Sequence, residues 1–177
     1  PFDGVKQPGY QTQVALQYDS GNYEGALKKA LKNANYEKLK KERAAARSDG
    51  KLMGIGFSTY IEACGIAPSA VVGSLGCRVG LYDAASIRVH PTGKVTIHAG
   101  AHSHGQGHET TFAQIVADSF GIGMDDVNVI HGDTENVPFG MGTYGSRSIA
   151  VCGSAIMKSV DKVKEKGARI AAHKLEC

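Results

Sequence analysis

The sequence predicts an α+β fold in which a small mixed sheet is packed by two or three helices. Apolar residues recur at helical spacing near both ends of the chain, and short stretches in the middle alternate with a period of two. Glycine makes up 23 of the 177 residues, well above its usual share of about 7%. Much of this glycine lies in two loops that each lead into a helix, where the backbone must turn sharply or approach a neighbour closely.

A helical region is predicted near the start of the chain. Residues 1–20 are polar and contain glycine and proline, which indicates an extended lead-in without a core of its own. Asp19 or Ser20 is placed to cap a helix that begins near Tyr23, and a second helix is expected to end at the turn 48–50.

The middle of the chain is predicted to supply the strands. The stretches 52–57 and 59–61 are expected to form a buried strand, and irregular structure should follow. Strands at 85–90 and 94–99 should pair as a hairpin, because the turn between them is Pro-Thr-Gly. A shorter strand is expected at 127–130.

Two helices are each expected to follow a glycine-rich loop. The first should run from about Glu109 to Phe120, and the second from Ser146 almost to the end of the chain. The inward stripe of the second helix is predicted to comprise Ile149, Cys152, Ile156, Val160, Val163 and Ile170.

Composition excludes several classes of protein. A net charge of +3 is too small to indicate a nucleic-acid binder, and no apolar run approaches the roughly 18 residues of a membrane span. The four cysteines form no metal-binding or CxxC spacing, so reduced thiols in a cytoplasmic protein are expected. The chain starts without Met and its last helical pattern runs uncapped into Cys177, so we expect a piece of a longer polypeptide.

The first glycine-rich loop, HSHGQGHETT at 102–111, is suited to a planar or anionic ligand. Gly105 and Gly107 lack Cβ atoms, and the N–H groups at the start of the next helix point outward unpaired. Gln106 offers one acceptor and two donors in a fixed amide plane. The alternative is that the glycines only shape a strand-to-helix corner capped by Thr110.

The second loop, PFGMGTYGSRS at 138–148, also ends at a helix N-terminus. Ser146 and Ser148 can cap that helix or bond a phosphate oxygen, and Arg147 supplies a cation. The alternative is a capped helix with Arg147 in a surface salt bridge.

Histidines of the first loop permit a metal site. His102, His104 and His108 have H-x-H-x3-H spacing, and neutral imidazole is a common metal ligand. Only Glu109 stands at a completing position, so hydrogen bonding is the alternative role of these histidines.

The sequence resembles the molybdenum hydroxylases, which are the xanthine dehydrogenase/aldehyde oxidase family, in three motifs that occur in the same order along the chain. These motifs are residues 102–118, 129–134 and 140–148. The resemblance extends from Tyr18 through the last helix. It is closest to the large, molybdopterin-binding chain of the aerobic carbon-monoxide-dehydrogenase-like branch. It therefore implies a segment of the cofactor-binding subunit of a molybdenum-dependent oxidoreductase.

The resemblance also implies the cofactor, its site and the partners. The cofactor is expected to be molybdopterin cytosine dinucleotide, with the first loop at the pterin and its phosphate and the second loop at the diphosphate or nucleotide end. The partners should be the remainder of the large subunit and the iron–sulfur and FAD subunits. The implied cofactor-binding residues are Gly105, Gln106, Gly107, His108, Thr110, Thr143, Tyr144, Gly145, Ser146, Arg147 and Ser148.

Departures from the family pattern limit what this piece should do alone. Neither the copper-binding run A-Y-x-C-S-F-R nor the catalytic glutamate segment has a match, so no catalytic residue and no metal ligand is assigned. His102 and His104 stand where the family often has glutamine. Residues 51–177 are therefore expected to form a partial molybdopterin-binding domain that is inactive by itself. Residues 1–50 are expected to form a helical lead-in before this domain. The alternatives are a non-catalytic binding or assembly module and a small histidine metal-binding domain.

Overall fold

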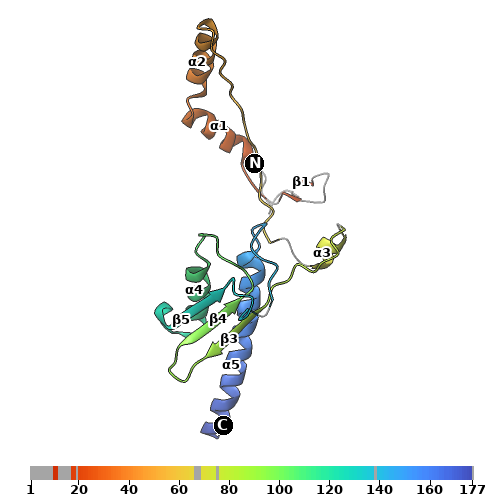
Figure 1. The fold of residues 1–177 in the computed structure, drawn as a ribbon, viewed down its shortest axis with the longest axis vertical. Helices are drawn as coiled ribbons and strands as arrows, with labels where there is room; N and C mark the ends of the chain where they lie inside the picture. Colours follow the sequence, from red (N-terminus) through yellow and green to blue (C-terminus); the bar gives the residue numbers. More distant parts are fainter. Residues whose placement is uncertain are drawn as a thin grey trace. The chain divides into compact units, whose positions relative to one another are not determined.

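The computed structural model describes residues 10–11, 17–18, 20–65, 69–74, 76–137 and 139–176. The chain divides into two compact units, Pro1–Ile61 and Glu62–Cys177 (Figure 1). The predicted lead-in lies within the first unit, and both glycine-rich loops lie within the second.

The described residues of the first unit form two helices and a two-stranded pairing. Strands β1 (Tyr10–Gln11) and β2 (Gln17–Tyr18) pair antiparallel. Helices α1 (Tyr23–Asn33) and α2 (Tyr36–Ser48) follow and contain no buried residue. Both helices begin and end close to where the sequence predicts them.

The cap of α1 differs from the prediction. The side chain of Asn22 accepts a hydrogen bond from the backbone N–H of Gly25 at 3.0 Å, so Asn22 is the N-cap residue. Ser20 instead accepts a hydrogen bond from the Tyr23 hydroxyl through its carbonyl oxygen, at 2.8 Å. Asp19 lies outside the described residues. Asn22 is the residue that directly precedes the first helical turn, where a short side-chain oxygen reaches the unpaired N–H groups.

The predicted buried strand at 52–61 does not form. This segment has neither helix nor strand, and Leu52 and Tyr60 are 96% and 89% exposed. A strand needs a partner for its N–H and C=O groups, and none of the described residues pairs with this segment. The prediction of a buried strand from the apolar pattern of this segment is therefore wrong.

The second unit contains the small mixed sheet that the sequence predicts. Strands β3 (Ala85–Val89) and β4 (Val95–Ala99) form the antiparallel hairpin, and β5 (Val127–His131) pairs parallel to β4. In this register Ile97 pairs with both Ile87 and Val129. The α+β prediction is confirmed.

Helices pack on this sheet and connect its strands. The parallel strands β4 and β5 are joined through α4 (His108–Phe120) and the 3-10 turn η1 (Met124–Asp126). A π-helical turn, η2 (Ser148–Cys152), leads into the long helix α5 (Gly153–Leu175). The six-residue helix α3 (Ser69–Ser74) falls where the sequence predicts irregular structure. No helix in the described part of the chain is long and apolar enough to span a membrane.

The core lies between the sheet and the two long helices. Alternate residues of β4 point into it, as the period of two requires. The core residues are Val95, Ile97, Ala99, Ala101, Phe112, Val116, Cys152, Ile156 and Val160.

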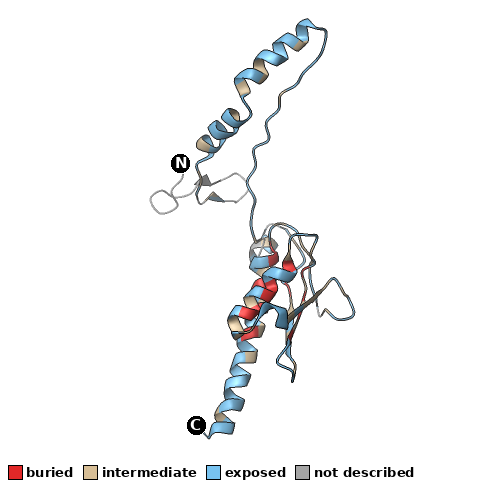
Figure 2. Cartoon of the chain, turned by 90° about the vertical axis from the view of Figure 1, so that its left-hand side faces the viewer, coloured by how far each residue is buried: buried red, intermediate tan, exposed pale blue. Residues whose placement is uncertain are grey.

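Only part of α5 reaches this core, which corrects the predicted stripe. Ile149 and Ile170 are 52% and 53% exposed, whereas Ile156 and Val160 are fully buried. Figure 2 shows the C-terminal end of α5 exposed. For Ile170 the physical reason is length, since a 23-residue helix extends about 34 Å and a five-residue strand only about 17 Å. Ile149 lies in η2, before α5, and lines a cavity instead of packing in the core.

Candidate functional site

The first glycine-rich loop is reached through Gly100, the residue after β4, and this glycine touches Gly140 of the second loop. A Cβ atom on Gly140 would overlap the carbonyl oxygen of Gly100, and a Cβ atom on Gly100 would overlap the carbonyl oxygen of Phe139. The Gly100 N–H donates to the Ala84 carbonyl at 3.0 Å, which ties the first loop to the residue before β3. Only glycine permits this approach of one backbone to another.

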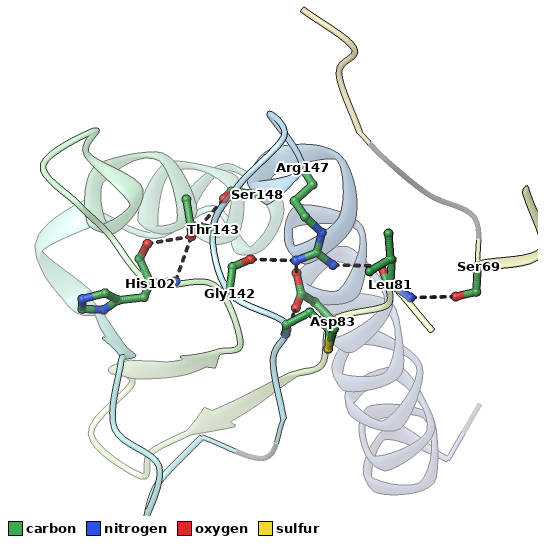
Figure 3. A network of polar contacts seen from close by, with 9 residues as sticks. Ser69, Leu81, Asp83, His102, Gly142, Thr143, Arg147 and Ser148 are labelled. Carbon is green, nitrogen blue, oxygen red and sulfur yellow. Dashed lines mark hydrogen bonds and ion pairs between the residues drawn. The ribbon is translucent and has the colours of Figure 1, made fainter. Parts of the chain in front are cut away.

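Thr143 joins the same two loops through its hydroxyl group. Its Oγ1 accepts from the His102 N–H at 3.0 Å and donates to the His102 carbonyl at 2.6 Å (Figure 3). The Ser148 hydroxyl donates to Thr143 Oγ1 at 3.3 Å. A hydroxyl has one donor and two acceptor positions, so all three are used here.

A cavity of about 420 Å³ lies where the loops meet. This volume falls within the range of ligand pockets, which is roughly 300–1,000 Å³. The residues that line the cavity are Gln106, His108, Thr111, Phe112, Thr143, Tyr144, Ser146, Arg147, Ser148 and Ile149. The structure thus brings residues from both predicted loops to one cavity.

Gln106 presents donors rather than its acceptor. Its Oε1 accepts a short hydrogen bond from the backbone N–H of His104. The two Nε2–H groups of the amide are therefore the ones that remain for a ligand with acceptor atoms, such as a phosphate or a pterin carbonyl.

The start of α4 provides further polar groups. The N-cap residue Gly107 has φ +80° and no side chain caps this end of the helix. His108 is 7% exposed, and among the described residues its Nδ1 has no hydrogen-bond partner. Its ring stacks on Phe112 at 5.2 Å, which holds the imidazole at the cavity. An uncapped helix N-terminus beside an unpaired buried nitrogen suits a polar, anionic ligand.

His108 is held in its neutral form. Burial lowers the pKa of His108 from its ordinary value of 6.5, and His131 lowers it further by charge repulsion. Glu109 acts in the opposite direction, but with a smaller effect than burial. A neutral imidazole offers one donor and one acceptor to the cavity.

Acidification is expected to destabilise the second unit through His108. As the pH falls through about 6.5, the unfolded chain takes up a proton on this imidazole that the folded chain resists, so stability falls with falling pH. Melting temperatures between about pH 8 and about pH 5 measure this loss, and His108→Gln should reduce it. The exposed His173 gives the control, because His173→Gln should keep the wild-type pH dependence. An unchanged slope for His108→Gln would contradict the assignment.

The backbone of Ser146 is strained. It has φ +50°, a left-handed conformation that a residue with a Cβ atom adopts at a cost of about 1–3 kcal/mol. Its hydroxyl donates to Glu62 Oε1 at 2.6 Å, and its carbonyl accepts from the Gly65 N–H at 3.1 Å. Glu62 and Gly65 therefore hold Ser146 in place at the cavity.

Arg147 lies in a buried ion pair. Its side chain and that of Asp83 are both 0% exposed, with Arg147 Nη1 2.9 Å from Asp83 Oδ2. This buried pair differs from the surface salt bridge of the alternative expectation. The guanidinium also lies over the Tyr144 ring, 5.2 Å from its centroid. The assignment of Arg147 as a cofactor-binding residue stays a prediction.

The loop histidines pair with each other and with a carboxylate. His102 Nδ1 lies 3.0 Å from His131 Nδ1, and His131 Nε2 lies 2.8 Å from Glu109 Oε1. The pKa of Glu109 is lowered by its own backbone N–H and then by His131. In the described part of the chain, no group of three or more His, Cys, Asp and Glu side chains is arranged to hold a metal ion. His102 therefore has the hydrogen-bonding role of the alternative, whereas His108 Nδ1 has no partner among the described residues.

Some predicted residues shape the site without lining the cavity, and others were missed. Gly105, Gly107, Thr110 and Gly145 are not among the lining residues. The residues that sequence reasoning missed are Glu62, Asp83, Thr111, Phe112 and Ile149. Glu62 and Asp83 lie more than 60 residues from their partners, so no local pattern signals them.

Comparison with known proteins defines the class. Residues 29–177 match the molybdopterin cofactor-binding domain family, and the chain belongs to that family. The carbon monoxide dehydrogenase large chain of Hydrogenophaga pseudoflava is 46% identical over 99% of this chain and 22% of its own length. The corresponding large chain of Afipia carboxidovorans is 44% identical, with the same coverage.

Solved structures show the same relationship. The Cu,Mo-CO dehydrogenase in its carbon monoxide reduced state matches with a TM-score of 0.67 and 43% identity, over 94% of this chain and 22% of that chain. Quinoline 2-oxidoreductase from Pseudomonas putida 86 matches with a TM-score of 0.72 and 33% identity, over 96% of this chain and 21% of that one. The chain spans about a fifth of the length of these relatives.

Proposed function

We propose that this chain forms part of the cofactor site in the large subunit of a molybdenum hydroxylase, an oxidoreductase of the carbon monoxide dehydrogenase or aldehyde oxidase kind. The observation that carries the proposal is that residues of both glycine-rich loops line one cavity of about 420 Å³. The similarity to two carbon monoxide dehydrogenase large chains over 99% of this chain supports it.

The residues around the cavity fit a polar, phosphate-bearing cofactor. The Nε2–H groups of Gln106, the unpaired Nδ1 of His108 and the uncapped start of α4 would bind its acceptor atoms. Ser146 and Ser148 also line the cavity, but their hydroxyl groups already donate to Glu62 and Thr143, so only their oxygen atoms are left to accept from a ligand. Phe112 gives an apolar wall. The molybdenum that molybdopterin carries would supply the redox chemistry, and these residues would bind and orient the cofactor.

The finer parts of the proposal concern the complete enzyme. We infer the cytosine dinucleotide form of the cofactor, a cytoplasmic enzyme, and partners comprising the rest of the large subunit with iron–sulfur and FAD subunits. The relative named 6-hydroxypseudooxynicotine dehydrogenase complex subunit gamma, 33% identical over 90% of this chain, is itself a subunit of a complex. Because this piece has no match to the catalytic glutamate segment, turnover should require the other parts.

Replacing Gln106 with glutamate is expected to weaken cofactor binding by about tenfold or more. The change is nearly isosteric, but it exchanges two donors for a negative charge that repels phosphate, and each hydrogen bond to a charged group contributes about 1.5–3 kcal/mol. The measurement is the amount of molybdopterin, released from a purified molybdenum enzyme, that the chain retains through gel filtration, read by pterin fluorescence after oxidation.

Gln114→Glu is the matched control for this experiment. Gln114 is exposed on α4, the helix that follows Gln106, and does not line the cavity, so the same charge change should leave retention at the wild-type level. Equal retention by Gln106→Glu and wild type would contradict the proposed site. A wild-type chain that retains no pterin would contradict the proposed function itself.

A further inference from the structure

Asp83 contacts the second loop at two separate points. Its Oδ1 accepts a hydrogen bond from the Met141 N–H at 2.9 Å, and its Oδ2 lies 2.9 Å from Arg147 Nη1 (Figure 3). The residues between these two points include Thr143, Tyr144 and Ser146, which line the cavity. One carboxylate therefore holds both ends of the cavity-lining segment 141–147.

The guanidinium of Arg147 also forms hydrogen bonds to the second loop and to the residues before β3. Nη1 also donates to the Gly142 carbonyl at 2.7 Å, and Nη2 donates to the Leu81 carbonyl at 2.8 Å (Figure 3). The Leu81 N–H in turn donates to Ser69 Oγ at 3.1 Å. Because each of these contacts has a defined direction, together they leave the loop little freedom to shift along its neighbours.

The loop needs such a restraint because its own sequence is permissive. Gly142 and Gly145 have φ +84° and +57°, and glycine has more conformational freedom in the unfolded state than any other residue. The second loop also presents Tyr144 half-exposed at the cavity. A loop with this glycine content presents its side chains to a ligand in a single arrangement only if contacts from outside the loop hold it in place.

A buried ion pair is not required for stability alone. Replacing such a pair by apolar residues of similar volume is often neutral for folding, whereas removal of one partner leaves an uncompensated buried charge. The Asp83–Arg147 pair, at 0% exposure on both sides, is therefore better explained by the geometry that it imposes.

We propose that Asp83 is a positioning residue for the molybdopterin site, which fixes segment 141–147 through the Met141 N–H and the Arg147 guanidinium. This inference rests on the proposed function. Asp83 itself does not line the cavity between the two loops, so it acts on the cofactor through the loop.

The first test replaces Asp83 alone in the 177-residue chain. Asp83→Asn should increase the hydrogen exchange rates of the Met141 and Arg147 amides, which are hydrogen-bonded in the wild type, by about tenfold or more, because the Arg147 charge loses its partner. Retention of molybdopterin in the gel-filtration assay should fall by a similar factor. Ile156→Val is the control for general destabilisation, since Ile156 is fully buried in the core and does not line the cavity. It should lower the melting temperature without lowering retention.

The second test separates positioning from charge satisfaction. The double variant Asp83→Leu with Arg147→Met removes both charges, so its melting temperature should return toward the wild-type value. If Asp83 positions the loop, exchange of the Met141 and Arg147 amides stays fast and pterin retention stays low in the double variant. Recovery of both would overturn the proposal. The exchange measurement needs no cofactor, so it tests the role of Asp83 even where the wild-type chain fails to retain pterin.

Discussion

Replacing Gly140 with alanine is expected to destabilise the second unit by about 3 kcal/mol. The added methyl group would overlap the carbonyl oxygen of Gly100, and that oxygen belongs to backbone that cannot rotate away as a side chain would. The loops would have to separate, which would also disturb the hydrogen bonds between Thr143 and His102. Urea unfolding followed by circular dichroism measures the loss.

Gly167→Ala is the matched control for this prediction. A Cβ atom on Gly167 meets nothing within 4 Å, and this glycine lies inside α5. Alanine there should stabilise the helix by up to about 1 kcal/mol, since glycine is a poor helix former. If Gly140→Ala proved as stable as Gly167→Ala, the close approach of the two loops would be wrong.

Replacing Phe112 with alanine is expected to cost about 3–5 kcal/mol of unfolding free energy, the usual range for a large aromatic residue in a core. Phe112 is fully buried between α4 and the sheet, lines the cavity and stacks on the His108 ring. The variant should therefore also retain less pterin than wild type, because the imidazole loses the surface that holds it. Thermal unfolding and the retention assay give the two readouts.

Phe120→Ala separates the two effects of Phe112. Phe120 lies at the end of the same helix, is only partly buried against the core and does not line the cavity. Its replacement should cost less stability and leave pterin retention unchanged at temperatures where the chain is folded. Loss of retention in both variants alike would mean that the effect of Phe112 on the site is only one of stability.

Elements with a strong local pattern were predictable from the sequence. The hairpin of β3 and β4 follows from two β-branched stretches around a Pro-Thr-Gly turn, and α4 follows from helical spacing after a glycine-rich loop. The two loops that line the cavity were found for the same reason, since glycine before a helix is a local signal.

Features that depend on a distant partner were not predictable in this way. The stretch 52–61 has the apolar residues of a buried strand but lies exposed, because a strand exists only with a neighbour to pair with. The burial of Arg147 in an ion pair with Asp83, 64 residues earlier, has no signal in the local sequence.

The sequence by itself determined the kinds of element, their order and the two glycine-rich corners, because each of these depends on residues close together along the chain. Tertiary structure alone decided that the corners share a cavity, that Gly100 and Gly140 touch, and that Arg147 is turned inward. These outcomes depend on contacts between residues that are far apart in the sequence. The carboxylate of Asp83 binds Arg147, and the absence of a Cβ atom at Gly140 lets two segments of backbone lie together.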